Sequence, residues 1–104
     1  MASLSTHILD TSAGRPAAGV RVVLESVDGE HLGDGVTDDD GRVAPLGPES
    51  IAPGDYRVRF DTGAYLGTDA FYPEVVVHFR AEGDQHYHVP LLLNPFGYST
   101  YRGS

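Results

Sequence analysis

The sequence predicts an all-β sandwich formed by a single domain. The 13 glycines and 7 prolines among its 104 residues fall between short apolar stretches. Several of these stretches alternate apolar and polar side chains, which is the period of a β-strand with one buried face. A chain of this length corresponds to one domain, here residues 1–104. We therefore expect seven or eight strands and one brief helix.

Alternation places most of the expected strands. The clearest two are residues 20–25 and 56–60, in which valine, leucine, tyrosine or phenylalanine face one side and arginine or Glu25 faces the other. Alternation is weaker in the third, with Val75, Val77 and Phe79 on the expected core side. The five strands expected from this pattern cover residues 20–25, 56–60, 74–80, 85–93 and 97–102.

Turn residues separate these strands. The expected turns contain Asp28-Gly29, Asp40-Gly41 and Pro53-Gly54-Asp55. Residues 62–70 lack alternation, and we expect them to form the short helix. No internal repeat or linker interrupts the chain.

Composition excludes several classes of protein. The absence of cysteine excludes disulfides, thiolate catalysis and cysteine-bound zinc. The net charge is -8 and the seven basic residues are scattered, so no basic surface for nucleic acid is expected. No apolar run approaches the roughly 18 residues of a membrane span. The N-terminal residues lack the pattern of a signal peptide, and we expect a soluble, cytoplasmic protein.

The densest acidic segment is not a calcium loop. An EF-hand loop ending its acidic positions at Gly41 would need an acidic residue at 36 and glutamate at 47, where the chain has Val36 and Gly47. We interpret Asp34 and residues 38–40 as a solvated acidic turn.

Histidine is the residue type best suited to catalysis in this chain. A Gly-x-Ser-x-Gly motif is absent, which leaves water activated by a general base or by a metal. Histidine suits the first role because its ordinary pKa lies near 6.5. The five histidines are His7, His31, His78, His86 and His88.

Spacing separates these histidines only in part. His86 and His88 are two apart, so on a strand they share a face. That face could simply be solvated, or it could bind zinc together with His7. The zinc alternative is disfavoured because no carboxylate or cysteine ligand pattern accompanies the histidines. His31 and His78 are expected to be exposed and without a catalytic role.

Two further features carry no unique interpretation by themselves. Arg42 follows the Asp40-Gly41 turn, so it is either an ordinary surface residue or a guanidinium that binds substrate oxygens. The last nine residues contain three aromatic side chains, which is unusual for a terminus and predicts that the segment is ordered against another surface.

Three segments resemble signatures of the transthyretin-related family that contains the 5-hydroxyisourate hydrolases. They are residues 5–11 with 14–17, residues 71–75 (Phe-Tyr-Pro-Glu-Val), and residues 86–104, which end in Tyr-Arg-Gly-Ser. Together they span essentially the whole chain in the family's order. The carrier protein transthyretin has a similar fold but lacks the terminal tetrapeptide and the set formed here by His7, Arg42 and His88. Asn94 stands where many relatives have serine.

The resemblance implies a fold, an activity and an assembly. The fold would be a transthyretin-like sandwich of two four-stranded sheets with one short helix. The activity would be hydrolysis of 5-hydroxyisourate to OHCU (2-oxo-4-hydroxy-4-carboxy-5-ureidoimidazoline) in urate and purine catabolism, without metal or cofactor. The assembly would be a homotetramer with active sites in clefts where dimers meet.

The resemblance also implies roles for individual residues. His7 and His88 would orient and deprotonate the attacking water, and Arg42 would hold the oxygens of the substrate. The residues implied to bind substrate are His7, Arg42, Tyr101, Arg102, Gly103 and Ser104. The main alternative is a binding module without catalytic activity, since one fold can serve many functions.

Overall fold

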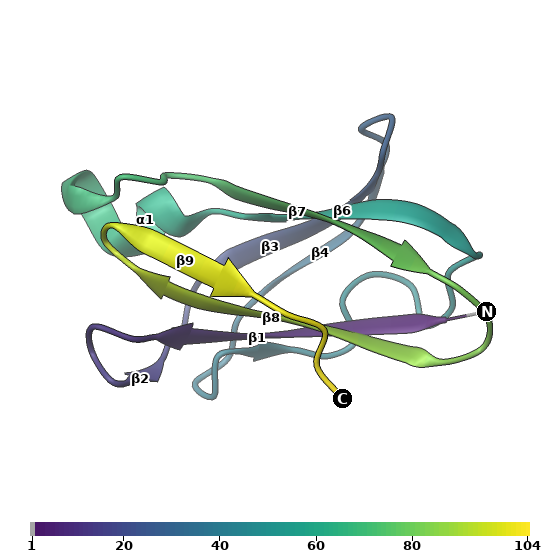
Figure 1. Cartoon of the computed structure of the whole chain (residues 1–104), viewed down its shortest axis with the longest axis horizontal. Helices are drawn as coiled ribbons and strands as arrows, with labels where there is room; N and C mark the ends of the chain where they lie inside the picture. The colour runs from purple at the N-terminus through teal and green to yellow at the C-terminus, as the bar shows by residue number, and fades with distance from the viewer. Residues whose placement is uncertain (1) are drawn as a thin grey trace.

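The computed structural model, which describes residues 2–104, contains two β-sheets packed against each other (Figure 1). The all-β class expected from the sequence is confirmed. One sheet contains β2 (Arg15–Pro16), β1 (Ser3–Asp10), β8 (His86–Asn94) and β9 (Gly97–Thr100) in that order, with β5 (Arg42–Val43) also paired to β1. The other contains β4 (His31–Val36), β3 (Arg21–Ser26), β6 (Gly54–Phe60) and β7 (Val75–Ala81) in that order.

The first sheet has five strands rather than four because β5 lies beside β1. The pairing is antiparallel, with Val43 opposite Thr6 and Arg42 opposite His7. β5 has only two residues, which is too short for a pattern of alternating side chains to predict it from the sequence. The strand β1 was also not among the ranges expected from alternation, because the polar Thr6 occupies a core position. Its side chain is 1% exposed and donates a hydrogen bond to the backbone oxygen of Val89 at 2.6 Å.

The core lies between the two sheets and is formed by one face of each. In Figure 1, β8 lies between β1 and β9, and β1 and β8 run in parallel. Val75 is buried and Val77 and Phe79 pack against the core, which confirms the side of β7 expected from the sequence. The largest fully buried apolar side chains are Phe60, Leu4, Ile8, Leu24, Leu46, Leu91 and Leu93.

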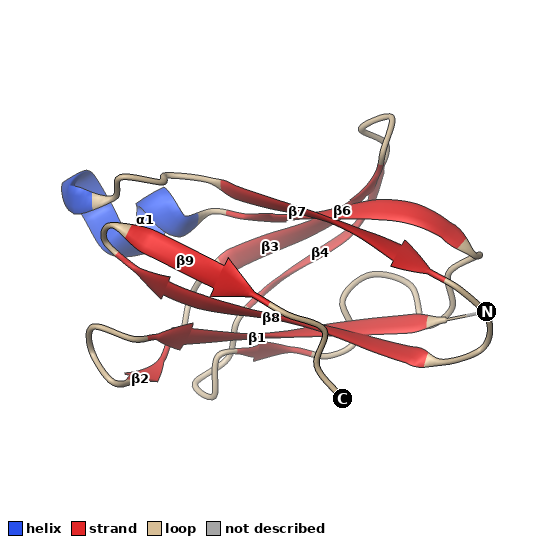
Figure 2. Ribbon diagram, viewed as in Figure 1, coloured by secondary structure: helices blue, strands red, loops and turns tan. Residues whose placement is uncertain are grey.

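The helical segment lies at one end of the sandwich (Figure 2). It consists of α1 (Thr62–Leu66) and the short 3-10 helix η1 (Gly67–Asp69), close to the range expected from the sequence. The side chain of Asp61 accepts a hydrogen bond from the backbone N–H of Ala64 at its N-terminus. No helix within the described residues is long and apolar enough to cross a membrane.

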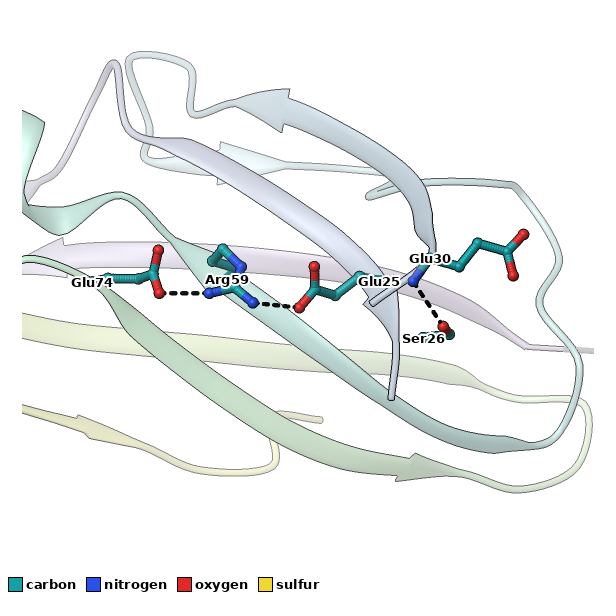
Figure 3. A network of polar contacts seen from close by, with 5 residues as sticks. All are labelled: Glu25, Ser26, Glu30, Arg59 and Glu74. Atoms are coloured by element: carbon teal, nitrogen blue, oxygen red, sulfur yellow. Dashed lines mark hydrogen bonds and ion pairs between the residues drawn. The ribbon is translucent and has the colours of Figure 1, made fainter. Parts of the chain in front are cut away.

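Alternation predicted that Glu25 lies on a solvated face, and this prediction is wrong. Glu25 points away from the core side of β3, yet it is only 8% exposed. The guanidinium of Arg59 on the neighbouring strand covers it, with a nitrogen–oxygen distance of 2.6 Å, and also pairs with Glu74 (Figure 3). A buried carboxylate is tolerable only when a hydrogen-bonded cation compensates its charge, and Arg59 meets that requirement.

Candidate active site

The candidate site lies on the outer face of the five-stranded sheet. In β1, Leu4, Thr6 and Ile8 point into the core, so Ser5 and His7 point to the opposite side. In β8 the buried Tyr87, Val89 and Leu91 likewise leave His86 and His88 on the outer side. The expectation that these two histidines share a face is confirmed, since both rings contact the hydroxyl of Ser5.

Strand pairing brings distant parts of the chain together on this face. The parallel register of β1 and β8 places Ser5 opposite His88 and His7 opposite Pro90. On the other side of β1, β5 places Arg42 opposite His7. Three of the residues implied by the resemblance, His7, Arg42 and His88, are therefore on adjacent strands of one face.

A tight acidic turn holds Arg42 in this place. The Asp38 carboxylate accepts hydrogen bonds from the backbone N–H groups of Asp40, at 2.9 Å, and Arg42, at 3.0 Å. Gly41 has a positive φ of 75°, and a Cβ there would overlap the backbone oxygen of Ile8. Only glycine fits both constraints. The acidic turn expected from the sequence thus has a structural role, which is to begin β5 at Arg42.

The C-terminal segment continues the pairing of β9 beyond its last strand residue. Thr100 lies opposite Leu91, and Gly103 forms a bridge with His88, donating its N–H to the His88 oxygen at 2.9 Å. The same register places Tyr101 opposite Pro90. A Cβ at Gly103 would collide with the imidazole of His88, so glycine allows this close approach. The prediction that the terminus is ordered against another surface is confirmed.

Arg102 does not join the outer face. Its guanidinium lies over the ring of Tyr87, 5.0 Å from the centroid, and donates a hydrogen bond to Gln85. Tyr87 is a core-facing residue, so this side chain lies on the opposite side of the sheet from His7. A pocket of about 230 Å³ opens at this edge. The pocket is lined by Val77, Phe79, Arg80, Tyr87, His88, Val89, Thr100, Tyr101 and Arg102.

The remaining two histidines, His31 and His78, are on a different sheet from His7, Arg42 and His88. His31 is exposed and lies 2.8 Å from a carboxylate oxygen of Asp34. His78 is exposed and lies 3.0 Å from a carboxylate oxygen of Asp55. Both are on strands of the four-stranded sheet. Their expected positions on the exposed surface agree with the structure.

Residues 2–104 contain no group of three or more histidine, cysteine, aspartate or glutamate side chains placed to hold a metal ion. The three histidines considered for zinc, His7, His86 and His88, therefore do not form such a group. In place of a shared ion, His86 and His88 share the Ser5 hydroxyl, at 2.7 Å from Nε2 of His86 and 2.8 Å from Nδ1 of His88.

Ser5 is the functional candidate that sequence reasoning missed. Its residue is 7% exposed, and its oxygen is the common partner of both histidines. A second hydroxyl, that of Ser3, lies 2.7 Å from Nδ1 of His86. The signal was present in the sequence, because Ser3, Ser5 and His7 alternate with Leu4 and Thr6 and so form a polar row on one strand face.

The electrostatic setting keeps His88 neutral. Partial burial lowers the pKa of its imidazole below the usual 6.5, and coulombic interaction first with Arg42 and then with His7 and His86 lowers it further. The contact with Ser5 opposes this shift only in part. At pH 7 the ring is therefore uncharged and can accept a proton, next to a guanidinium that can bind oxygen atoms of a ligand. This combination suits proton transfer at a carbonyl compound.

Comparison with known proteins identifies the family to which this chain is similar. Residues 4–103 match the HIUase/transthyretin family. A 5-hydroxyisourate hydrolase from Salmonella dublin is 53% identical, over 97% of this chain and 80% of that protein. The structure of Klebsiella pneumoniae 5-hydroxyisourate hydrolase superposes with a TM-score of 0.92 at 40% identity, covering 100% of both chains. Sea bream transthyretin in complex with thyroxine superposes with a TM-score of 0.87 at 36% identity, covering 96% of this chain and 93% of that one.

The electrostatic argument makes a direct prediction for NMR titration. In the wild-type protein the His88 ring should titrate below pH 6.5. Replacing Arg42 by Gln removes one of the positive charges that lower the pKa, so the midpoint should move upward. Arg57→Gln, on the other sheet, is the matched control and should leave the midpoint unchanged. An unchanged midpoint in Arg42→Gln would show that Arg42 does not act on His88.

Proposed function

Because the chain belongs to the HIUase/transthyretin family, we propose that it hydrolyses 5-hydroxyisourate to OHCU. The observation that carries the proposal is the convergence of His7, Arg42 and His88 on one face, in a chain 53% identical to the Salmonella dublin hydrolase. The reaction opens a ring between a carbonyl carbon and a nitrogen. It therefore needs an attacking water, a base for its proton and donors for the carbonyl oxygen.

In this mechanism His88 is the general base. Its lowered pKa leaves it neutral at pH 7, and the Ser5 contact occupies Nδ1 and leaves Nε2 for the water. His7, across the strand pair, orients the same water. Since only the neutral ring accepts a proton, kcat/KM is constant above the pKa of His88 and falls as the pH drops below it.

Arg42 and the C-terminal segment bind the substrate. A guanidinium presents planar donors, which suit the carbonyl oxygens of a flat ring. Tyr101 and Gly103 border the same face through the register of the last segment, and Ser104 follows directly after Gly103. Arg102 contributes by holding this segment through Tyr87 and Gln85 rather than by touching substrate.

A ligand carrier is the alternative function, since sea bream transthyretin, with a similar fold, is solved in complex with thyroxine. A carrier requires a binding cleft but no base. The neutral His88 beside Arg42 favours catalysis. The two functions differ in a simple test, because a carrier would bind 5-hydroxyisourate without accelerating its loss.

We further propose a single-domain subunit that assembles as a homotetramer with its sites at the dimer–dimer interface. The polar cluster lies on an exposed sheet face, which excludes water poorly from a flat ligand. A second copy of the chain placed on this face would convert it into a cleft. The cytoplasmic location expected from the sequence stays a prediction.

The activity itself is the first test. With 5-hydroxyisourate generated from urate by urate oxidase, the protein should accelerate the spectroscopic decay of this compound. EDTA or a stronger chelator should leave the rate unchanged, because no step of the proposed mechanism uses a metal. An inactive protein would refute the function, and activity lost to a chelator and restored by zinc would refute the metal-free mechanism.

Variants of the cluster test the assigned roles. His7→Asn and His88→Asn should each lower turnover by on the order of a hundredfold or more, since general acid–base catalysis contributes that much. Arg42→Lys keeps the charge but loses the planar donors, and should also impair the enzyme. His31→Asn and His78→Asn are matched controls with near wild-type rates. A control variant as damaging as His88→Asn would contradict the assignment.

The terminal segment yields a separate prediction. Residues added after Ser104 would leave the sheet beside His88, within the proposed site. A C-terminal tag should therefore cripple turnover, whereas an N-terminal tag should be far better tolerated. Deleting residues 101–104 should abolish activity but largely spare the fold, because the core lies upstream. Initial rates, circular dichroism and size-exclusion chromatography decide the matter; a C-terminally tagged protein with full turnover would remove the segment from the site.

A further inference from the structure

We propose that Ser5, His86 and Ser3 form a proton relay that connects His88 with solvent. The proposal rests on the proposed function, in which His88 exchanges a proton with water. The four side chains form an unbroken row: Nδ1 of His88 to Oγ of Ser5 at 2.8 Å, Oγ of Ser5 to Nε2 of His86 at 2.7 Å, and Nδ1 of His86 to Oγ of Ser3 at 2.7 Å.

The row leads from a sheltered end to an open one. Ser5 is 7% exposed and His88 is partly buried, whereas His86 is exposed and Ser3 is partly exposed. The register of β1 and β8 explains the alternation of serine and histidine, because it places Ser3 opposite His86 and Ser5 opposite His88. The relay is thus a product of two parallel strands with polar residues at every second position.

The count of protons on Ser5 restricts the relay to two neutral states. A hydroxyl has one proton, so Ser5 donates to one imidazole and accepts from the other. If it donates to His86, then His88 carries its proton on Nδ1 and Nε2 is free to act as a base. If it donates to His88, then His88 carries its proton on Nε2 and acts as an acid.

Passage between these states balances the reaction. The water's oxygen bonds to the carbonyl carbon while its proton moves to Nε2 of His88. The Nδ1 proton of His88 moves to Ser5, the Ser5 proton to Nε2 of His86, and the Nδ1 proton of His86 to Ser3, which releases its own to solvent. The carbon–nitrogen bond then breaks, the Nε2 proton of His88 passes to the leaving nitrogen, and one proton returns along the same row.

The relay solves an electrostatic problem of the site. Partial burial and the charge of Arg42 disfavour a positive charge on the His88 ring. A base that held the water's proton there would be opposed by both effects. Moving the proton onward keeps His88 neutral in both states.

Kinetics of three variants test the relay. Ser5→Ala and His86→Ala should lower kcat by on the order of tenfold or more with little change in KM. Ser5→Thr keeps a hydroxyl and should restore most of the rate. The wild-type enzyme should show a curved proton inventory in mixtures of light and heavy water, which becomes linear in Ser5→Ala. The matched control is His78→Asn, which should show wild-type kcat and a curved inventory.

Rescue separates a relay from a merely structural role. Because His86 is at the open end, added imidazole should restore turnover to His86→Ala but not to Ser5→Ala. Wild-type kcat in both alanine variants, or a reduced kcat without rescue and with an unchanged inventory, would overturn the relay. Circular dichroism of each variant checks folding.

Nitrogen NMR distinguishes failure of the relay from failure of the proposed function. In the wild-type protein the relay predicts a defined exchange between the two tautomers of His88, which Ser5→Ala should abolish. This measurement needs no substrate. A protein inactive on 5-hydroxyisourate but with this tautomer exchange would refute the function alone, and an active enzyme whose His88 tautomers are indifferent to Ser5→Ala would refute the relay alone.

Discussion

The parallel pairing of β1 with β8 is the constraint on which the candidate site depends. It runs over eight residue pairs, from Ser3 beside His86 to Asp10 beside Leu93. Because side chains on a strand alternate between faces, a shift of one residue would exchange the faces. His88 would then point into the core and its apolar neighbours would face outward. The cost of exposing those buried residues holds the register, and the register in turn holds Ser5, His7 and His88 on one face of two adjacent strands.

Alternation allowed much of this fold to be predicted, and its failures have physical causes. β3 and β6 alternate clearly, and β7 more weakly, because each has one apolar core face. β1 was not predicted because the polar Thr6 lies in the core, where its hydroxyl donates a hydrogen bond to the backbone oxygen of Val89. β5 has only two residues, and its existence depends on pairing with a distant strand. Glu25 was placed in solvent because the pattern cannot show that Arg59 covers it.

The site was less accessible to sequence reasoning than the fold. Spacing showed that His86 and His88 share a face, but His7 and Arg42 entered through family resemblance, since only long-range pairing brings them near. The Ser5 hydroxyl was overlooked although it alternates with buried residues. Arg102 was grouped with the substrate-binding residues, yet its side chain lies over Tyr87 on the other side of the sheet. In an extended chain the side chains of adjacent residues point to opposite faces of the sheet, so Tyr101 and Arg102 cannot both face the candidate site.

The same pairing has a consequence for biosynthesis. β1 leaves the ribosome early, and its partner β8 follows only after some eighty further residues, as the separation between Ser5 and His88 records. Until then β1 lacks the strand with which it forms eight residue pairs, and its unpaired edge is open to wrong partners. Folding of this sheet must wait for a contact between the two extremes of the chain, which favours slow, late folding. A nascent chain interrupted before β8 would therefore carry all strands of the four-stranded sheet, but neither a finished five-stranded sheet nor the candidate site.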